Sequence, residues 1–121
     1  MSDLTVDTRD VEDLTVLYPR GFINAHTVRG FDAAIQKAVA RSRVRIVVNC
    51  EGLDYIASAG LGAMMGAIEE IRGAGGDLRL AGLNDTVRNI FEILGFNHLY
   101  RTYASEAEAL ASFREGGQAG S

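Results

Sequence analysis

The feature that most constrains the fold is the apolar run VRIVVNC, residues 44–50, which contains four β-branched residues. A run of this length with so little polar alternation is typical of a strand that is buried on both faces of a parallel sheet. Such a strand needs helices on both sides of the sheet, and the rest of the chain must supply them. The run therefore predicts an α/β fold.

The flanking sequence alternates between the periods of strands and helices. Alternating apolar residues or short apolar runs predict further strands at 4–8, 14–19, 77–82 and 98–103. Apolar residues at helical spacing predict helices within 24–42, 59–73, 84–95 and 105–113, the last with a capping box. Pro19, which lacks an N–H donor, is expected to end its strand or to cause a bulge. The order predicts a mixed, mostly parallel sheet of about five strands with about four helices.

The length of 121 residues, with 47% hydrophobic and 23% charged residues, fits one domain. We expect this domain at residues 1–114 and a disordered, Gly-rich tail at 115–121. A net charge of −4 and the lack of a basic cluster argue against a nucleic-acid partner. Neither a signal peptide nor an apolar membrane span is evident, so a cytoplasmic protein without membrane insertion is expected. The single cysteine, Cys50, is expected to be a small buried residue.

Ser58 is the candidate functional residue. It lies between Ala57 and Ala59 in the loop before the second helix, and such loops at the carboxyl ends of strands often carry function. One interpretation makes Ser58 the N-cap of the helix, with Gly60 and Gly62 only letting the helix approach the sheet. The other makes it an open hydroxyl that another protein modifies. The residues alone leave both interpretations open.

Catalysis by Ser58 is not expected. The segment is not a G-x-S-x-G nucleophile elbow, because Ile56 stands two positions before the serine. His26 and His98 are the only histidines, and neither has metal-ligand spacing with other side chains. Phosphorylation fits better, because a phosphate is tolerated at a helix N-terminus but disrupts a docked interface. We therefore expect no enzyme activity, no cofactor and no metal site.

Several motifs in order carry a family resemblance. They are ASAGLG at 57–62, GGDLRL at 75–80, the capped segment 84–96, and GFINAHT at 21–27. Together they resemble the anti-sigma factor antagonists, which are bacterial STAS-domain proteins, over residues 4–113. The resemblance implies a single STAS-like domain that acts as a partner switch.

In such a switch the unphosphorylated protein binds an anti-sigma factor that is also a serine kinase. Phosphorylation of Ser58 would break the complex, and a serine phosphatase would restore it. The resemblance places the partner-binding residues at Asn24, Ala57, Ser58, Ala59, Gly60, Leu61 and Gly62. The family often has Asp or Ser at position 57, Ser or Thr at 59 and Asp at 24, so these differences bear on which kinase is the partner.

Three alternatives use the same sequence features. A STAS domain could act without phosphorylation, as a scaffold in a stress-signalling assembly or as an accessory subunit of a lipid transporter. A phosphorelay receiver would need a lysine after its acceptor aspartate, but the only lysine, Lys37, precedes Asp54. A nucleotide-binding loop at GAGG, residues 73–76, would need a following Gly-Lys-Ser or Gly-Lys-Thr, which is absent.

Overall fold

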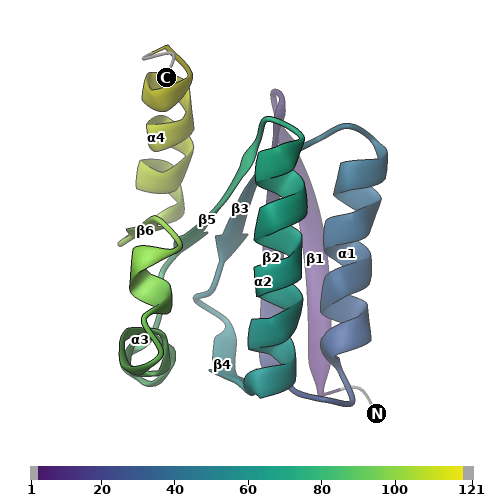
Figure 1. Ribbon diagram of the computed structural model, residues 1–121, viewed down its shortest axis with the longest axis vertical. Helices are drawn as coiled ribbons and strands as arrows, with labels where there is room; N and C mark the ends of the chain where they lie inside the picture. The colour runs from purple at the N-terminus through teal and green to yellow at the C-terminus, as the bar shows by residue number, and fades with distance from the viewer. Residues whose placement is uncertain (1–2, 119–121) are drawn as a thin grey trace.

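The computed structural model describes residues 3–118, and its element order follows the predicted one with two additions (Figure 1). The strands are β1 (Leu4–Val11), β2 (Leu14–Ile23), β3 (Arg45–Asn49), β4 (Leu53–Ile56), β5 (Asp77–Ala81) and β6 (Thr102–Tyr103). The helices are α1 (Val28–Ala40), α2 (Ser58–Gly73), α3 (Asp85–Ile93) and α4 (Glu106–Gln118), with a 3-10 turn at Phe96–His98.

The sheet has the order β1-β2-β3-β5-β6, and β4 pairs separately with β2. Only β1 runs antiparallel to its neighbour, so the prediction of a mixed, mostly parallel sheet is confirmed. The sheet has six strands, one more than expected, and the additional strand is β4. Its four residues do not alternate, since the two outer residues are buried and the two inner ones are exposed. β6 is shorter than the predicted strand 98–103 because a 3-10 turn occupies residues 96–98.

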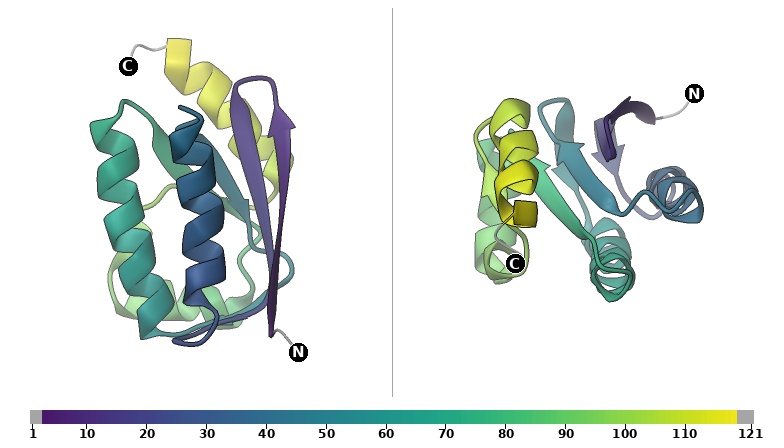
Figure 2. Two further views of the ribbon diagram at one scale, coloured as in Figure 1. Left: turned by 90° about the vertical axis from the view of Figure 1, so that its right-hand side faces the viewer. Right: turned by 90° about the horizontal axis from the view of Figure 1, so that it is seen from above.

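The helices form layers on both faces of the sheet. Helices α1 and α2 lie side by side on one face, and α4 lies on the other (Figure 2). Ile46 and Val48 of β3 join the core beneath α1 and α2, whereas Val47 joins the smaller core beneath α4. The prediction that residues 44–50 form a strand buried on both faces is therefore confirmed.

Pro19 lies at the point where β2 changes its partner. Residues 14–17 of β2 pair with β3, and residues 21–23 pair with β4. Pro19 falls between these segments, where no ladder on that side needs its missing N–H. The strand does not end at Pro19, so that part of the prediction was wrong. An irregularity does occur nearby, between Gly21 and Phe22.

Helix α4 is anchored by its cap and by a buried arginine. The predicted capping box is confirmed, because the Ser105 hydroxyl accepts a hydrogen bond from the Glu108 amide at 3.2 Å. Arg79, which is 8% exposed, bonds to Asp77 and lies 4.1 Å from the centre of the Phe113 ring. The expected tail starts at residue 115, whereas α4 extends to Gln118 and residues 119–121 lie outside the described residues. The domain boundary at 114 stays a prediction.

Two further expectations concern burial and membranes. Cys50 is 3% exposed, as expected for a small buried residue, and burial raises the pKa of its thiol to about 12. The thiol is therefore protonated at neutral pH and is a poor nucleophile. None of the helices within residues 3–118 combines the length and the apolar character needed to cross a membrane.

Candidate functional site

Two connecting segments meet at the carboxyl ends of β2 and β4. Strands β2 and β4 are parallel and pair Ile23 with Ile56 at their ends. The Ala57 amide then donates a hydrogen bond of 2.8 Å to the Ile23 carbonyl. Because β2 and β4 end side by side, the loop that begins at Asn24 and the helix that begins at Ser58 are neighbours. This geometry brings together the two segments that contain the predicted docking residues.

Ser58 is the first residue of α2, and the N-cap is Ala57. The interpretation of Ser58 as the N-cap was therefore wrong by one position. Ala57 is extended, and its carbonyl accepts hydrogen bonds from the amides of Gly60 at 2.9 Å and Leu61 at 3.1 Å. Alanine has no side-chain acceptor, so the first amides of α2 receive no side-chain cap. Among residues 3–118, the amides of Ser58 and Ala59 have no carbonyl partner.

The hydroxyl of Ser58 is open to solvent. The residue is exposed, and its neighbours Ala57 and Ala59 are small and half-buried. No side-chain hydrogen bond joins Ser58 to another residue that the structure describes, and the first turn of α2 has no acidic residue. A hydroxyl therefore stands beside unpaired amides at the positive end of a helix, an arrangement that suits an anion.

The two glycines after Ser58 have different surroundings. A Cβ atom on Gly60 would lie 2.5 Å from Ile23 Cγ2 and 2.7 Å from Ile56 Cγ1. The interpretation that a glycine lets the helix approach the sheet is therefore correct for Gly60. A Cβ atom on Gly62 would have no neighbour within 4 Å, so Gly62 is not needed for packing.

The predicted docking residues separate into exposed and buried members. Ser58 and Gly62 are exposed, and Asn24, Ala57 and Ala59 are half-buried. The remaining two, Gly60 and Leu61, face the core, where Leu61 is only 6% exposed. Only the first five can present a surface to an approaching protein without a rearrangement of α2.

Asn24 orders the turn before α1. Its Oδ1 atom accepts hydrogen bonds from the amides of His26 at 2.8 Å and Thr27 at 3.1 Å. The Thr27 hydroxyl in turn accepts from the Asn24 amide at 2.9 Å and donates to the Phe22 carbonyl at 2.7 Å. Thr27 is the N-cap by position but makes no side-chain cap bond to α1. Asn24 and Thr27 therefore stabilise the turn together.

An exposed aromatic pair lies next to the carboxyl ends of β2 and β4. Phe22 of β2 and Tyr55 of β4 are partners in the parallel register, with 46% and 44% of their surfaces exposed. Large exposed apolar side chains that lie together often mark contact surfaces. Sequence reasoning did not identify Tyr55, because it did not predict β4. The exposed Met65 lies two helical turns after Ser58, whereas Met64 is buried.

Asn84 holds the strand that leads to Ser58. Its Oδ1 atom caps α3 by accepting from the Val87 amide at 2.8 Å. Its Nδ2 group donates to the Leu53 carbonyl of β4 at 3.0 Å. One side chain thus fixes both the start of α3 and the short strand before the candidate site.

The fold and the site define a class of protein, namely a mixed α/β domain that presents an open serine at a strand-to-helix junction. The family model of the STAS domain matches residues 5–109, so the chain belongs to the STAS domain family. This finding confirms the fold class and the family that the sequence motifs indicated.

Individual relatives agree with this assignment. BtrV of Bordetella bronchiseptica, named as a candidate anti-sigma factor antagonist, is 30% identical over 111 residues, covering 92% of this chain and 94% of BtrV. The anti-sigma factor antagonist SpoIIAA in its unphosphorylated form superposes with a TM-score of 0.80 at 26% identity, covering 92% and 97% of the two chains. The phosphorylated form of Bacillus SpoIIAA gives a TM-score of 0.69 at 24% identity, covering 89% and 96%.

Proposed function

We propose that this protein is an anti-sigma factor antagonist that switches partners through phosphorylation of Ser58. In its unphosphorylated state it binds an anti-sigma factor that is also a serine kinase. The kinase transfers the terminal phosphoryl group of its ATP to the Ser58 oxygen, which loses its proton, and ADP remains on the kinase. The phosphorylated protein is then released, and a serine phosphatase resets it by hydrolysis.

The observation that carries this proposal is the exposed Ser58 hydroxyl, which has no hydrogen-bond partner among the described residues. A kinase must reach the acceptor oxygen without displacing an existing interaction. The small side chains of Ala57 and Ala59 leave room for that approach. The relatives named as antagonists, one of them solved in phosphorylated and unphosphorylated forms, support the same assignment.

The surroundings of Ser58 let one phosphate affect the complex and the fold differently. A phosphate adds roughly −1.5 to −2 charges at neutral pH. Next to the open amides at the start of α2 this charge is favoured by about 0.3–1 kcal/mol. Within a docked interface that offers no cation, burial of the same charge costs several kcal/mol. Because each 1.4 kcal/mol changes affinity about tenfold, the complex is lost while the domain stays folded.

The chain itself supplies no catalytic base in this scheme, so it acts as the substrate of the kinase and not as an enzyme. Asn24, Ala57 and Ala59 are uncharged, so the partner kinase must recognise the hydroxyl without carboxylates at these three positions. The exposed pair of Phe22 and Tyr55 offers apolar contact area next to the carboxyl ends of β2 and β4.

The test uses the purified protein and the partner isolated with it from the native organism. We expect wild type and Ser58→Ala to capture a kinase-like anti-sigma factor, and Ser58→Asp to lose at least tenfold in affinity. The captured kinase, supplied with ATP, should add one phosphate to wild type and none to Ser58→Ala, as measured by intact mass and peptide mapping.

Ser42→Ala is the matched control, because Ser42 is also exposed but follows the C-terminal end of α1, whereas Asn24 of the site precedes the N-terminal end of that helix. It should bind and accept phosphate like wild type. Equal capture by all Ser58 variants would instead favour the unphosphorylated scaffold, and recovery of a transporter complex would favour an accessory subunit. Both outcomes would overturn the proposed switch.

A further inference from the structure

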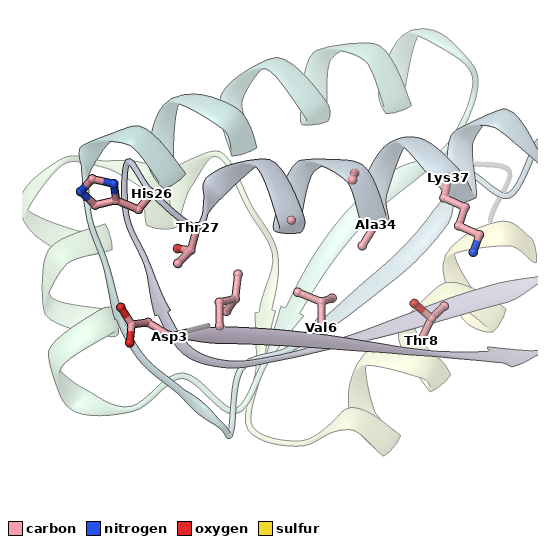
Figure 3. A pocket seen from close by; sticks show the side chains of 10 residues that line it. Asp3, Val6, Thr8, His26, Thr27, Ala34 and Lys37 are labelled. Carbon is pink, nitrogen blue, oxygen red and sulfur yellow. The ribbon is translucent and has the colours of Figure 1, made fainter. Parts of the chain in front are cut away.

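A groove runs between α1 and β1 on the side of the molecule away from α4. Its cavity volume is about 600 Å³, and a second hollow of about 200 Å³ continues it along the same helix. Figure 3 shows Val6 and Thr8 of β1 facing Ala34 and Lys37 of α1 across it. We refer to this hollow as the β1–α1 groove. It lies beside the outer edge of the sheet, because β1 is the terminal strand.

The edge of β1 that borders the groove is available for pairing. The Phe22 amide donates to the Asp3 carbonyl at 3.0 Å, and alternation along the antiparallel ladder directs the odd-numbered residues of β1 toward β2. The backbone groups of Val6 and Thr8 therefore point away from the sheet. Within residues 3–118, β2 is the only strand that pairs with β1. An open edge of this kind is a template for another strand.

The two ends of the groove carry opposite charge. Asp3 lies at one end, near His26, and Lys37 lies at the other, near Thr8 (Figure 3). No ion pair is formed by Asp3 or Lys37 with any residue that the structure describes. A two-fold axis perpendicular to β1 reverses the direction of the groove. Asp3 of each copy then lies near Lys37 of the other copy, so the two-fold axis produces two equivalent Asp3–Lys37 contacts.

The flank of α1 is shaped for close approach. Gly30, Ala33 and Ala34 line the groove, and Gly30 has nothing within 4 Å of the position of a Cβ atom. Helix α1 packs against both β1 and β2, so antiparallel pairing of two β1 edges would separate the two α1 helices by about two strand spacings. That distance is roughly 9.6 Å, which lies within the usual 8–10 Å between packed helices.

From these observations we propose that the protein forms a homodimer in which a second copy of the chain pairs antiparallel with β1 and packs its α1 helix along the β1–α1 groove. The interface is isologous, as a two-fold dimer requires. Charged side chains often protect an edge strand from pairing, but Asp7 and Arg9 alternate with Val6 and Thr8 and lie on the opposite face of β1 from the groove. On the groove side, Asp10 lines the second hollow, where it is ion-paired with Arg41 and Arg43, and Val6 and Thr8 leave the centre of that face uncharged.

Sedimentation velocity of the full chain, up to about 1 mM protein, measures the dimer directly. The Thr8→Pro variant removes an outward N–H while leaving the β1–β2 ladder intact, so the dimer should dissociate at least tenfold more readily. Thr8→Val keeps that N–H and should associate like wild type. Circular dichroism and thermal unfolding establish that each variant is folded.

Charge exchange tests the direction of pairing. Lys37→Glu and Asp3→Lys should each weaken the dimer, by roughly threefold to tenfold, because like charges then meet at both ends. The double variant Asp3→Lys/Lys37→Glu should restore association to within about threefold of wild type. Ser58→Ala and Ser58→Asp should leave the dimer unchanged, which separates this proposal from the phosphorylation switch. A wild type that stays monomeric at every concentration, or a dimer that all variants retain, would overturn the proposal.

Discussion

At the scale of single residues, neighbouring positions of α2 differ in whether they face the core or the solvent. The spacing of Leu61, Met64, Ile68 and Ile71 predicts one buried helical face, and all four are buried. The same spacing places Leu61 toward the core, although the family resemblance included it among the docking residues. Helical phase correctly predicts that Leu61 is buried, whereas its role as a docking residue stays a prediction.

The pair Gly60 and Gly62 gives a direct test of this difference. Gly60→Ala places a methyl group against Ile23 and Ile56, so we expect a loss of about 1–3 kcal/mol in the free energy of unfolding. Gly62→Ala meets open space and should stabilise the protein by up to about 1 kcal/mol, because alanine favours helix. Urea denaturation of both variants measures the contrast. Equal effects would show that the close approach of α2 to the sheet is not tight.

The N-terminus of α2 shows what sequence could not resolve at this scale. Serine is a common N-cap, so Ser58 was a reasonable candidate by residue type. The structure assigns the cap to Ala57, because the Ala57 amide is held by the Ile23 carbonyl of a strand 34 positions earlier in the chain. A long-range contact sets the first helical residue, and local preference does not record such contacts.

At the scale of elements, the order of strands and helices was predictable because each long element keeps one period. β4 was missed because it is only four residues long and its residues do not alternate, and its position depends on β2 and Asn84. The predicted strand at 98–103 was shortened because Tyr100 is buried among Phe91 and Phe96 instead of joining the sheet. Short elements are decided by tertiary contacts.

Asn84 provides the prediction at this scale. Asn84→Ala removes the cap of α3 and the bond to the Leu53 carbonyl, and we expect a loss of about 1–2 kcal/mol in the free energy of unfolding. Asn89→Ala in the same helix is the control, because Asn89 is exposed and caps nothing, so its effect should lie within about 0.5 kcal/mol. Hydrogen exchange should also show faster exchange of β4 amides in Asn84→Ala only.

If Asn84→Ala changes stability without accelerating exchange in β4, the side chain stabilises α3 alone. The strand that leads to Ser58 would then be held by its pairing with β2. Identical exchange in the two asparagine variants would contradict the dual role assigned to Asn84.

At the scale of the whole molecule, Glu106 joins three parts of the fold. It begins α4 and bonds to Arg9 of β1 and to Asn49 of β3. Partial burial raises the pKa of its carboxyl, but hydrogen bonds from Asn49, Tyr18 and Arg9 outweigh that effect and hold the pKa below its usual value. The pKa of Asp10 is lowered as well, chiefly by its hydrogen bond with Arg41.

These two shifts predict acid sensitivity. A carboxyl whose folded pKa is lowered stabilises the protein above the unfolded pKa, and that contribution is lost as the pH falls through the folded pKa. The unfolded values are 4.5 for Glu106 and 3.8 for Asp10, so stability should be constant near neutrality and decline below about pH 5. Urea denaturation between pH 7 and pH 3 measures this decline, and Glu106→Gln should make it shallower.

In the sheet, β2 pairs first with β3 and then with β4, and this change of partner has a consequence for how such proteins diversify. β2 leaves β3 after Leu17 and joins β4 from Gly21, so the two branches share no ladder beyond Pro19. Ile23, Leu53 and Ile56 of the branch that ends beside Ser58 belong to the main core, so only its exposed positions, such as Phe22 and Tyr55, can change without disturbing the central frame. A lineage can in this way acquire new binding preferences at one branch while inheriting the same scaffold unchanged.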